Sequence, residues 1–205
     1  MPRECLDPPP PYNTEKPRVV LVHGIHAREG TSNVRKLVPY FEAKGFEVLV
    51  FEYGWLGVIG ARWRNPGIAR HLASVMRTAD HLVCHSNGAT LAWLAMENHG
   101  MRCARVSLIA PALDSDKILQ GSPFTDVYYN GCDHVVWFAR LLVDHAWGSM
   151  GRDGCELSGR GMHNVDVANH AALPRICGHL EYFEPHILPR FAPWLVRRHL
   201  DYLAA

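Results

Sequence analysis

Short apolar runs that stop at a polar or small residue recur along this chain of 205 residues, and helix-forming stretches follow several of them. The clearest run is Arg18–Val22, which ends at His23-Gly24. A continuous β-branched run of this kind is typical of a strand buried on both faces of a parallel sheet. The same pattern predicts further strands at 46–53, 81–85, 105–109, 126–129 and 164–168.

Helices are predicted between these strands, at 31–44, 65–78, 88–98, 135–143 and 187–203. Thr31 or Ser32 is expected to cap the first helix and Gly45 to end it. Strands that alternate with helices predict an α/β three-layer sandwich with a mostly parallel sheet of about six strands. In such sheets the chemistry lies at the carboxyl ends of the strands.

The bulk composition is that of an ordinary globular protein, with 48% apolar and 20% charged residues. A net charge of +1 gives no electrostatic reason to expect nucleic acid or an anionic membrane as partner. No apolar run approaches the roughly 20 residues that cross a bilayer. The six cysteines include no C-x-x-C pair and are expected to be free thiols.

The chain is expected to form one domain over residues 18–205, preceded by a proline-rich arm at 1–17. The run Pro8–Pro11 favours an extended segment without internal hydrogen bonds. This N-terminal segment lacks the apolar centre of a signal peptide, and the predicted location is therefore cytoplasmic.

Ser86 stands where the run His81–His85 changes abruptly into the helix-forming segment that begins at Gly88. A serine at such a tight strand-to-helix turn projects its hydroxyl above the sheet, where a histidine base and a carbonyl substrate can both approach it. The alternative is that Ser86 only caps the helix. Cys84 is a rival nucleophile, although its place within the strand predicts that it points into the core.

Three features together resemble the α/β-hydrolase superfamily: the run 19–24, the elbow 84–88, and the chain order Ser, Asp, His. The resemblance covers the chain from about Arg18 onward and is that of a compact member without a separate lid domain. In the family's elbow pattern a glycine stands two residues before the serine, and Cys84 occupies that position here.

The resemblance implies a catalytic triad of Ser86, Asp133 and His179. Asp133 follows the strand at 126–129 and would hold the histidine in the correct tautomer. Asp114 is its rival, and Asp133 could instead cap the next helix. His170 is the main rival of His179 as the general base.

Two backbone N–H groups, those of Ile25 and Asn87, would form the oxyanion hole, with His26 as the alternative to Ile25. No cofactor and no metal are expected. A metal site of His163, Asp166 and His170 would require this segment to be helical, and its valines favour a strand.

Two further segments are assigned with alternatives. Tyr53, Trp55, Leu56 and Trp63 could line an apolar acyl pocket or simply pack in the core. The stretch 147–161 borders the substrate entrance or is a mobile surface loop, and it lacks the Lys-Ser/Thr ending of a phosphate-binding loop.

The resemblance therefore implies a serine hydrolase that cleaves a small or medium carboxylic ester, or a thioester, through an acyl-enzyme. An amidase on the same triad is one alternative, and a non-catalytic binding protein on a degenerate hydrolase fold is the other. The expected partner is a small-molecule ester, with no nucleic acid and no membrane span. The oligomeric state stays open.

Overall fold

The computed structural model describes residues 16–27, 30–78, 80–136, 138, 147–159 and 161–204. Six strands form one parallel sheet in the order β2-β1-β3-β4-β5-β6. Their bounds are β1 Arg18–Val22, β2 Glu47–Phe51, β3 His81–His85, β4 Arg105–Ile109, β5 Thr125–Tyr129 and β6 Met162–Asp166. The predicted α/β sandwich with about six parallel strands is confirmed. The predicted arm lies outside the described residues up to position 15.

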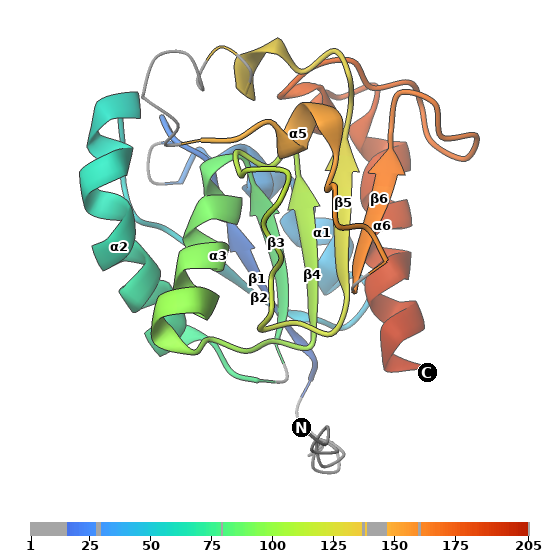
Figure 1. Cartoon of the computed structure of the whole chain (residues 1–205). Coiled ribbons are helices and arrows are strands. Elements are labelled where there is room, and N and C mark those ends of the chain that lie inside the picture. The colour runs from blue at the N-terminus through green and yellow to red at the C-terminus, as the bar shows by residue number, and fades with distance from the viewer. Residues whose placement is uncertain are drawn as a thin grey trace, which may run out of the picture.

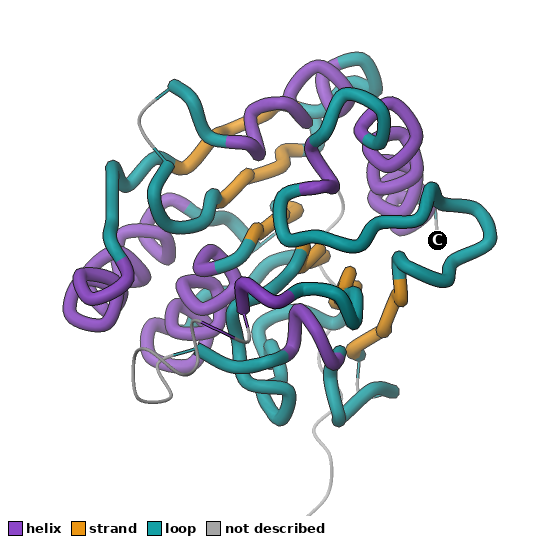
Figure 2. Tube along the Cα trace, turned by 90° about the horizontal axis from the view of Figure 1, so that it is seen from above, coloured by secondary structure: helices purple, strands orange, loops and turns teal. Residues whose placement is uncertain are grey.

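Helices cover both faces of the sheet, as Figure 1 shows and as the view from above in Figure 2 makes plain. The helical elements are η1 Asn33–Leu37, α1 Val38–Glu42, α2 Val58–Val75, α3 Asn87–His99, α5 Met150–Asp153, η2 Glu181–Phe183 and α6 Leu188–Leu203. Helices α2 and α3 lie on one face, and α1 and α6 on the other. No helix in the described ranges has the length and apolarity to span a bilayer.

Successive side chains along a strand point to opposite faces of the sheet. In β1, Val20 and Val22 pack toward α2 and α3, whereas Val19 and Leu21 pack toward α1 and α6. All four side chains are fully buried. Because helices cover both faces, neither side of β1 meets solvent, which explains the continuous apolar run 19–22 in the sequence.

Helix α2 differs from its prediction, because it begins at Val58 rather than at Asn65. The dipeptide Asn65-Pro66 looks like a helix cap followed by a proline in the first turn. In the structure Pro66 lies inside the helix and Asn65 is buried. The packing of Ala61 and Leu72 against the core outweighs the hydrogen bond that the proline removes.

Two other segments also differ in detail. The predicted helix at 31–44 is a 3₁₀ turn followed by the short α1, and Gly45 ends it at φ 85° as expected. The stretch 147–161 is not a mobile surface loop over its described part, since it contains α5 and buries Trp147 and Met150. The predicted helix at 135–143 lies mostly outside the described residues.

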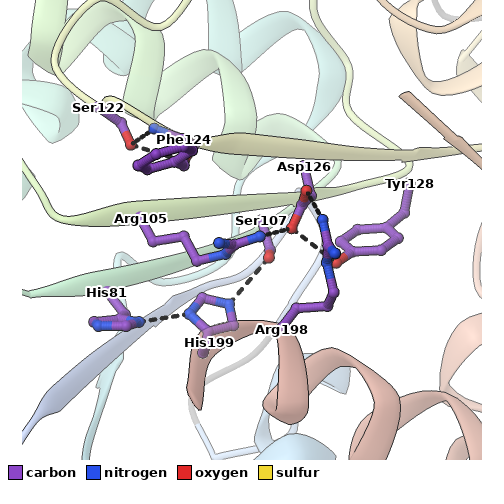
Figure 3. Close-up of polar contacts among 9 residues, drawn as sticks. All are labelled: His81, Arg105, Ser107, Ser122, Phe124, Asp126, Tyr128, Arg198 and His199. Carbon is purple, nitrogen blue, oxygen red and sulfur yellow. Dashed lines mark hydrogen bonds and ion pairs between the residues drawn. The ribbon is translucent and has the colours of Figure 1, made fainter. Parts of the chain in front are cut away.

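A buried polar cluster joins α6 to the amino ends of the central strands, at the edge opposite Ser86 (Figure 3). His81 Nδ1 lies 2.7 Å from His199 Nδ1, and His199 Nε2 lies 3.0 Å from Ser107 Oγ. Beside them, the carboxylate of Asp126 accepts hydrogen bonds from Arg105 and, at 3.0 Å, from Arg198. These ion pairs fix the position of α6 on the sheet. A shift of the helix would leave a buried charge without its partner, which would lower the stability of the fold.

The two histidines of this cluster make stability depend on pH. Burial lowers the pKa of His81 to about 4, and burial together with the neighbouring His81 lowers the pKa of His199. Below pH 6.5, roughly the usual histidine pKa, these two histidines bind protons in the unfolded chain but stay neutral in the folded chain. The free energy of unfolding should therefore fall by about 1.4 kcal/mol per pH unit for each histidine as the pH drops toward 4.

Urea unfolding at a series of pH values measures this slope. The double variant His81→Gln/His199→Gln should flatten the slope even where its absolute stability is lower, because the proton uptake on unfolding is gone. The exposed His163→Gln serves as the control and should leave the slope unchanged. An equal slope in the double variant would contradict the assignment.

Candidate active site

Ser86 occupies a strained turn between β3 and α3. Its backbone lies at φ 54° and ψ −121°, a conformation that a non-glycine residue adopts only when its surroundings impose it. Three backbone hydrogen bonds do so: Ser86 N–H donates to Ile109 O at 3.0 Å, and Ser86 O accepts from Ala89 and Ala112 N–H. The side chain is 7% exposed. The tight turn predicted from the sequence is present.

Asp133 and His179 meet beyond the carboxyl ends of the strands. Asp133 Oδ2 lies 2.8 Å from His179 Nδ1, and the Asp133 carboxylate is fully buried. The second oxygen, Oδ1, accepts hydrogen bonds from the N–H groups of Val135 and Val136. Asp133 therefore caps the following helical turn and forms a hydrogen bond with His179 at the same time, so the cap leaves the predicted role beside the histidine open.

His85, the residue before Ser86, ties the His179 loop to the elbow. Its ring lies 4.8 Å from the ring of His179, and its Nε2 donates to the His179 carbonyl at 3.2 Å. Burial, reinforced by the neighbouring His179, lowers the pKa of His85 to about 3, so the ring is neutral. A neutral His85 can hold the loop without placing a competing positive charge beside His179.

The hydroxyl of Ser86 forms no hydrogen bond with any residue of the described chain, His179 included. Catalytic hydrogen bonds are often long or poorly aligned in a free enzyme and shorten in the substrate complex. The structure thus joins His179 to Asp133 directly, and to Ser86 through the adjacent His85.

Gly24 lies against Ser86. A Cβ on Gly24 would stand 2.9 Å from Ser86 Cβ, closer than real carbon contacts allow. Next to it, the N–H of Ile25 and the N–H of Asn87 have no protein acceptor in the described ranges. The N–H of His26, the alternative donor, is already used by Leu56 O at 3.0 Å. Of the three predicted candidates, only the N–H groups of Ile25 and Asn87 therefore lack an acceptor among the described residues.

The rings of His23 and Tyr53 hold the backbone near Gly24 in place. His23 is buried, stacks on Tyr53 at 4.0 Å and donates from Nδ1 to Gly24 O at 2.6 Å. The hydroxyl of Tyr53 lies 2.9 Å from His23 O and 2.8 Å from Gly24 O. His23 therefore packs against the loop that contains Gly24.

A buried amide network holds Asn87, and sequence analysis did not foresee it. The side chains of Asn65 and Asn87 exchange two hydrogen bonds, at 2.8 and 3.1 Å. The indole N–H of Trp147 donates to Asn87 Oδ1 at 3.0 Å. These three residues come from α2, α3 and the segment before α5, so only the folded chain brings them together. The network fixes the side chain of Asn87, the first residue of α3 and the one that directly follows Ser86.

The rival residues lie elsewhere. His170 contacts the ring of Trp194 at 5.2 Å, and its Nδ1 accepts from Ala172 N–H. Asp114 lies against the backbone of Gly148 and makes no hydrogen bond to a histidine within the described residues. Cys84 is fully buried and burial raises the pKa of its thiol, so it points into the core as predicted.

Five of the six cysteines, Cys84 included, and the predicted alternatives for the metal site can be compared with the described residues. Cys84, Cys103, Cys132, Cys155 and Cys177 are free thiols. The segment with His163 and Asp166 is the strand β6, so the helical spacing that a metal site needed is not realised. In the described ranges no three or more side chains of metal-ligand type are grouped to hold an ion.

Of the four side chains predicted either to line an acyl pocket or to pack in the core, two line a groove. A surface groove of about 440 Å³ is lined by Tyr53, Trp63, Arg64, Gly67, Ile68 and His71. Leu56 is instead part of the core, and Trp55 is 59% exposed and stacks on His26. The sequence could not separate these side chains, because pocket and core both use aromatic and aliphatic residues.

The close approach of Gly24 to Ser86 makes a sharp prediction. On the prediction that Ser86 attacks an ester, Gly24→Ala should lower kcat/KM by about 10- to 100-fold, since the added methyl group displaces either Ser86 or the Ile25 N–H by a fraction of an ångström. Steady-state kinetics on a chromogenic ester measures the loss. Gly131→Ala is the matched control, because a Cβ there meets nothing within 4 Å. Equal activities of the two variants would contradict the proposed geometry.

Comparison with known proteins places this arrangement in a fold family. No protein-family model matches the chain, and no curated protein is similar in sequence. Solved structures do match. Alpha/beta hydrolase domain-containing protein 10 from mouse aligns with a TM-score of 0.59 and 12% identity, over 94% of this chain and 92% of that one. The chain has the α/β-hydrolase fold.

Two further solved structures agree with this assignment. A dienelactone hydrolase from Anabaena variabilis matches with a TM-score of 0.56 and 14% identity, over 93% of this chain and 88% of that one. The ydeN gene product of B. subtilis gives a TM-score of 0.56 and 14% identity, over 93% of this chain and all (100%) of that one. At such low identity these structures establish the fold alone, and the activity has to be argued from the site.

Proposed function

We propose that this α/β-hydrolase-fold protein is a serine hydrolase that cleaves small or medium carboxylic esters, or thioesters, through an acyl-enzyme intermediate. The observation that carries the proposal is the strained Ser86 turn beside the Asp133–His179 hydrogen bond. A helix cap alone needs neither that backbone conformation nor a neighbouring buried carboxylate–imidazole pair.

In the first half-reaction His179 Nε2 takes the Ser86 hydroxyl proton while Oγ forms a bond to the substrate carbonyl carbon. Asp133 holds the Nδ1–H tautomer and stabilises the imidazolium. The N–H groups of Ile25 and Asn87 stabilise the oxyanion, where one such donor is typically worth about 2.7–4 kcal/mol. His179 then gives its proton to the departing alcohol or thiol, and the acyl group stays on Ser86.

In the second half-reaction water replaces the leaving group. His179 takes a proton from water, the resulting hydroxide attacks the acyl carbon, and the carboxylic acid leaves as Ser86 regains its proton. Neither step requires a cofactor. The Asn65–Asn87–Trp147 network supports this chemistry, because it fixes the residue that supplies one oxyanion donor.

Labelling with a fluorophosphonate tests the proposal without knowledge of the natural substrate. We expect one adduct by intact mass, mapped to the Ser86 peptide. The absence of any adduct on folded protein would contradict an activated serine and favour the binding-protein alternative. A panel of p-nitrophenyl esters, thioesters and anilides then separates esterase from amidase, and preferential cleavage of anilides would overturn the ester assignment.

A further inference from the structure

Most large apolar side chains that are exposed to solvent lie on segments that follow the carboxyl ends of the strands. The described residues include seven of them: Trp55, Ile59, Trp63, Phe124, Val135, Phe138 and Leu180. Six lie on segments that begin at the carboxyl edge of the sheet, around α2, Asp133 and His179, and only Phe124 precedes a strand. Scattered apolar residues need no explanation, but a concentration on one side of a molecule marks an interaction surface.

The densest part of this concentration is the outward face of α2. Ile59 and Trp63 are 75% and 77% exposed and stand four residues apart, so they share one face of the helix. The opposite face is buried through Ala61, Ile68 and Leu72. In Figure 1, α2 is the outermost helix on its side of the sheet, which leaves this face open.

Trp55 extends the surface toward the site. It is 59% exposed, and its ring lies over Gly57 at the start of α2. The same ring stacks on His26 at a centroid distance of 5.6 Å. Since His26 follows Gly24 and Ile25, the apolar surface reaches the loop beside Ser86.

Positive charge surrounds this apolar face. Arg62, Arg64 and Arg70 of α2 are exposed, and the helix contains no aspartate or glutamate. At 100° per residue, Arg62 and Arg64 stand on either side of Trp63. None of the three forms an ion pair within the described chain. The whole chain carries a net charge of only +1, so the overall composition does not reveal this local concentration of positive charge on α2.

We propose that the outward face of α2, with Trp55, docks on a bilayer surface rich in anionic phospholipid. Tryptophan is favoured at the boundary between headgroups and acyl chains. Arginines beside it can extend to the phosphates while their stems lie on apolar surface. Helices that lie in the interface combine these features. Docking would bring the loop next to Ser86 close to the lipid surface.

A second copy of this chain fits the surface less well. Closed dimers pair the same surface of both subunits. Such a pairing would place the arginines that flank Trp63 near those of the other copy, with no acidic side chain on α2 to offset them. Anionic headgroups supply the charge that the helix lacks.

Sedimentation of the full chain with sucrose-loaded vesicles tests the proposal independently of catalysis. We expect strong binding to an equal mixture of phosphatidylcholine and phosphatidylglycerol, weak binding to phosphatidylcholine alone, and weaker binding as salt is raised. Arg62→Glu/Arg64→Glu should reduce the partition coefficient by about tenfold or more. Trp63→Ser should reduce it in a similar way by removing the inserted ring.

Matched controls come from the opposite end of the molecule. Phe124→Ser removes another exposed aromatic ring, and Arg102→Glu reverses another exposed charge. Both should bind like the parent protein, and thermal unfolding checks that all variants are folded. The proposal is overturned if the phosphatidylglycerol vesicles do not bind the protein, or if the α2 variants bind them as well as the controls. It is also overturned if sedimentation equilibrium shows a dimer that Trp63→Ser dissociates, since the surface would then join two copies.

Discussion

Ser86→Ala is expected to lower kcat for ester hydrolysis by about 10⁴- to 10⁶-fold and to abolish fluorophosphonate labelling. The expected loss is large because the acyl-enzyme cannot form, whereas the oxyanion donors and the fold stay in place. The Ser86 hydroxyl makes no hydrogen bond within the described residues, so its removal should change stability little. Steady-state kinetics and intact mass measure the two effects, and thermal unfolding confirms the folded state.

Cys84→Ala is the control for this variant, because it removes a nearby buried thiol that the mechanism does not use. It should keep labelling and most of the activity, at a cost of about 1 kcal/mol in stability. Retention of labelling in Ser86→Ala, or its loss in Cys84→Ala, would show that the nucleophile is another residue.

Asp133→Asn should lower kcat by about 10⁴-fold, the second large effect. An asparagine keeps the oxygen that accepts from Val135 and Val136, and therefore preserves the helix cap. It loses the negative charge next to His179 Nδ1, and with it the tautomer and the stabilised imidazolium. The substitution thus separates the catalytic contribution of Asp133 from its structural one.

Two variants complete that experiment. Asp114→Asn changes the rival acid, which contacts no histidine in the described structure, and its kcat should stay within about twofold of the parent value. Asp133→Ala removes the cap as well and should cost about 1 kcal/mol more in stability than Asp133→Asn. A large loss of kcat in Asp114→Asn, with activity retained in Asp133→Asn, would reverse the assignment of the acid.

Local pattern alone was sufficient for the sheet and for the position of Ser86. Short runs rich in apolar residues predicted all six strands to within a few residues, most directly β1, in which the last four side chains are apolar and fully buried. The change from the run 81–85 to a helix-forming segment likewise marked the turn at Ser86. The start of α2 was missed, because Asn65-Pro66 has the local chemistry of a helix start while the core contacts that override it are distant in sequence.

Residues that act as pairs depended on the tertiary structure. Thirteen histidines offered several candidates, and the hydrogen bond between His179 and Asp133, residues 46 positions apart, distinguishes one of them. The Asn65–Asn87–Trp147 network and the exposed arginines of α2 have no signature in the sequence either. A run of residues carries its own burial pattern, whereas contact between distant side chains is created only when strands and helices pack. The fold could therefore be predicted from local chemistry. Asp133 and His179 were named from the family resemblance, and only the folded chain shows that their side chains meet.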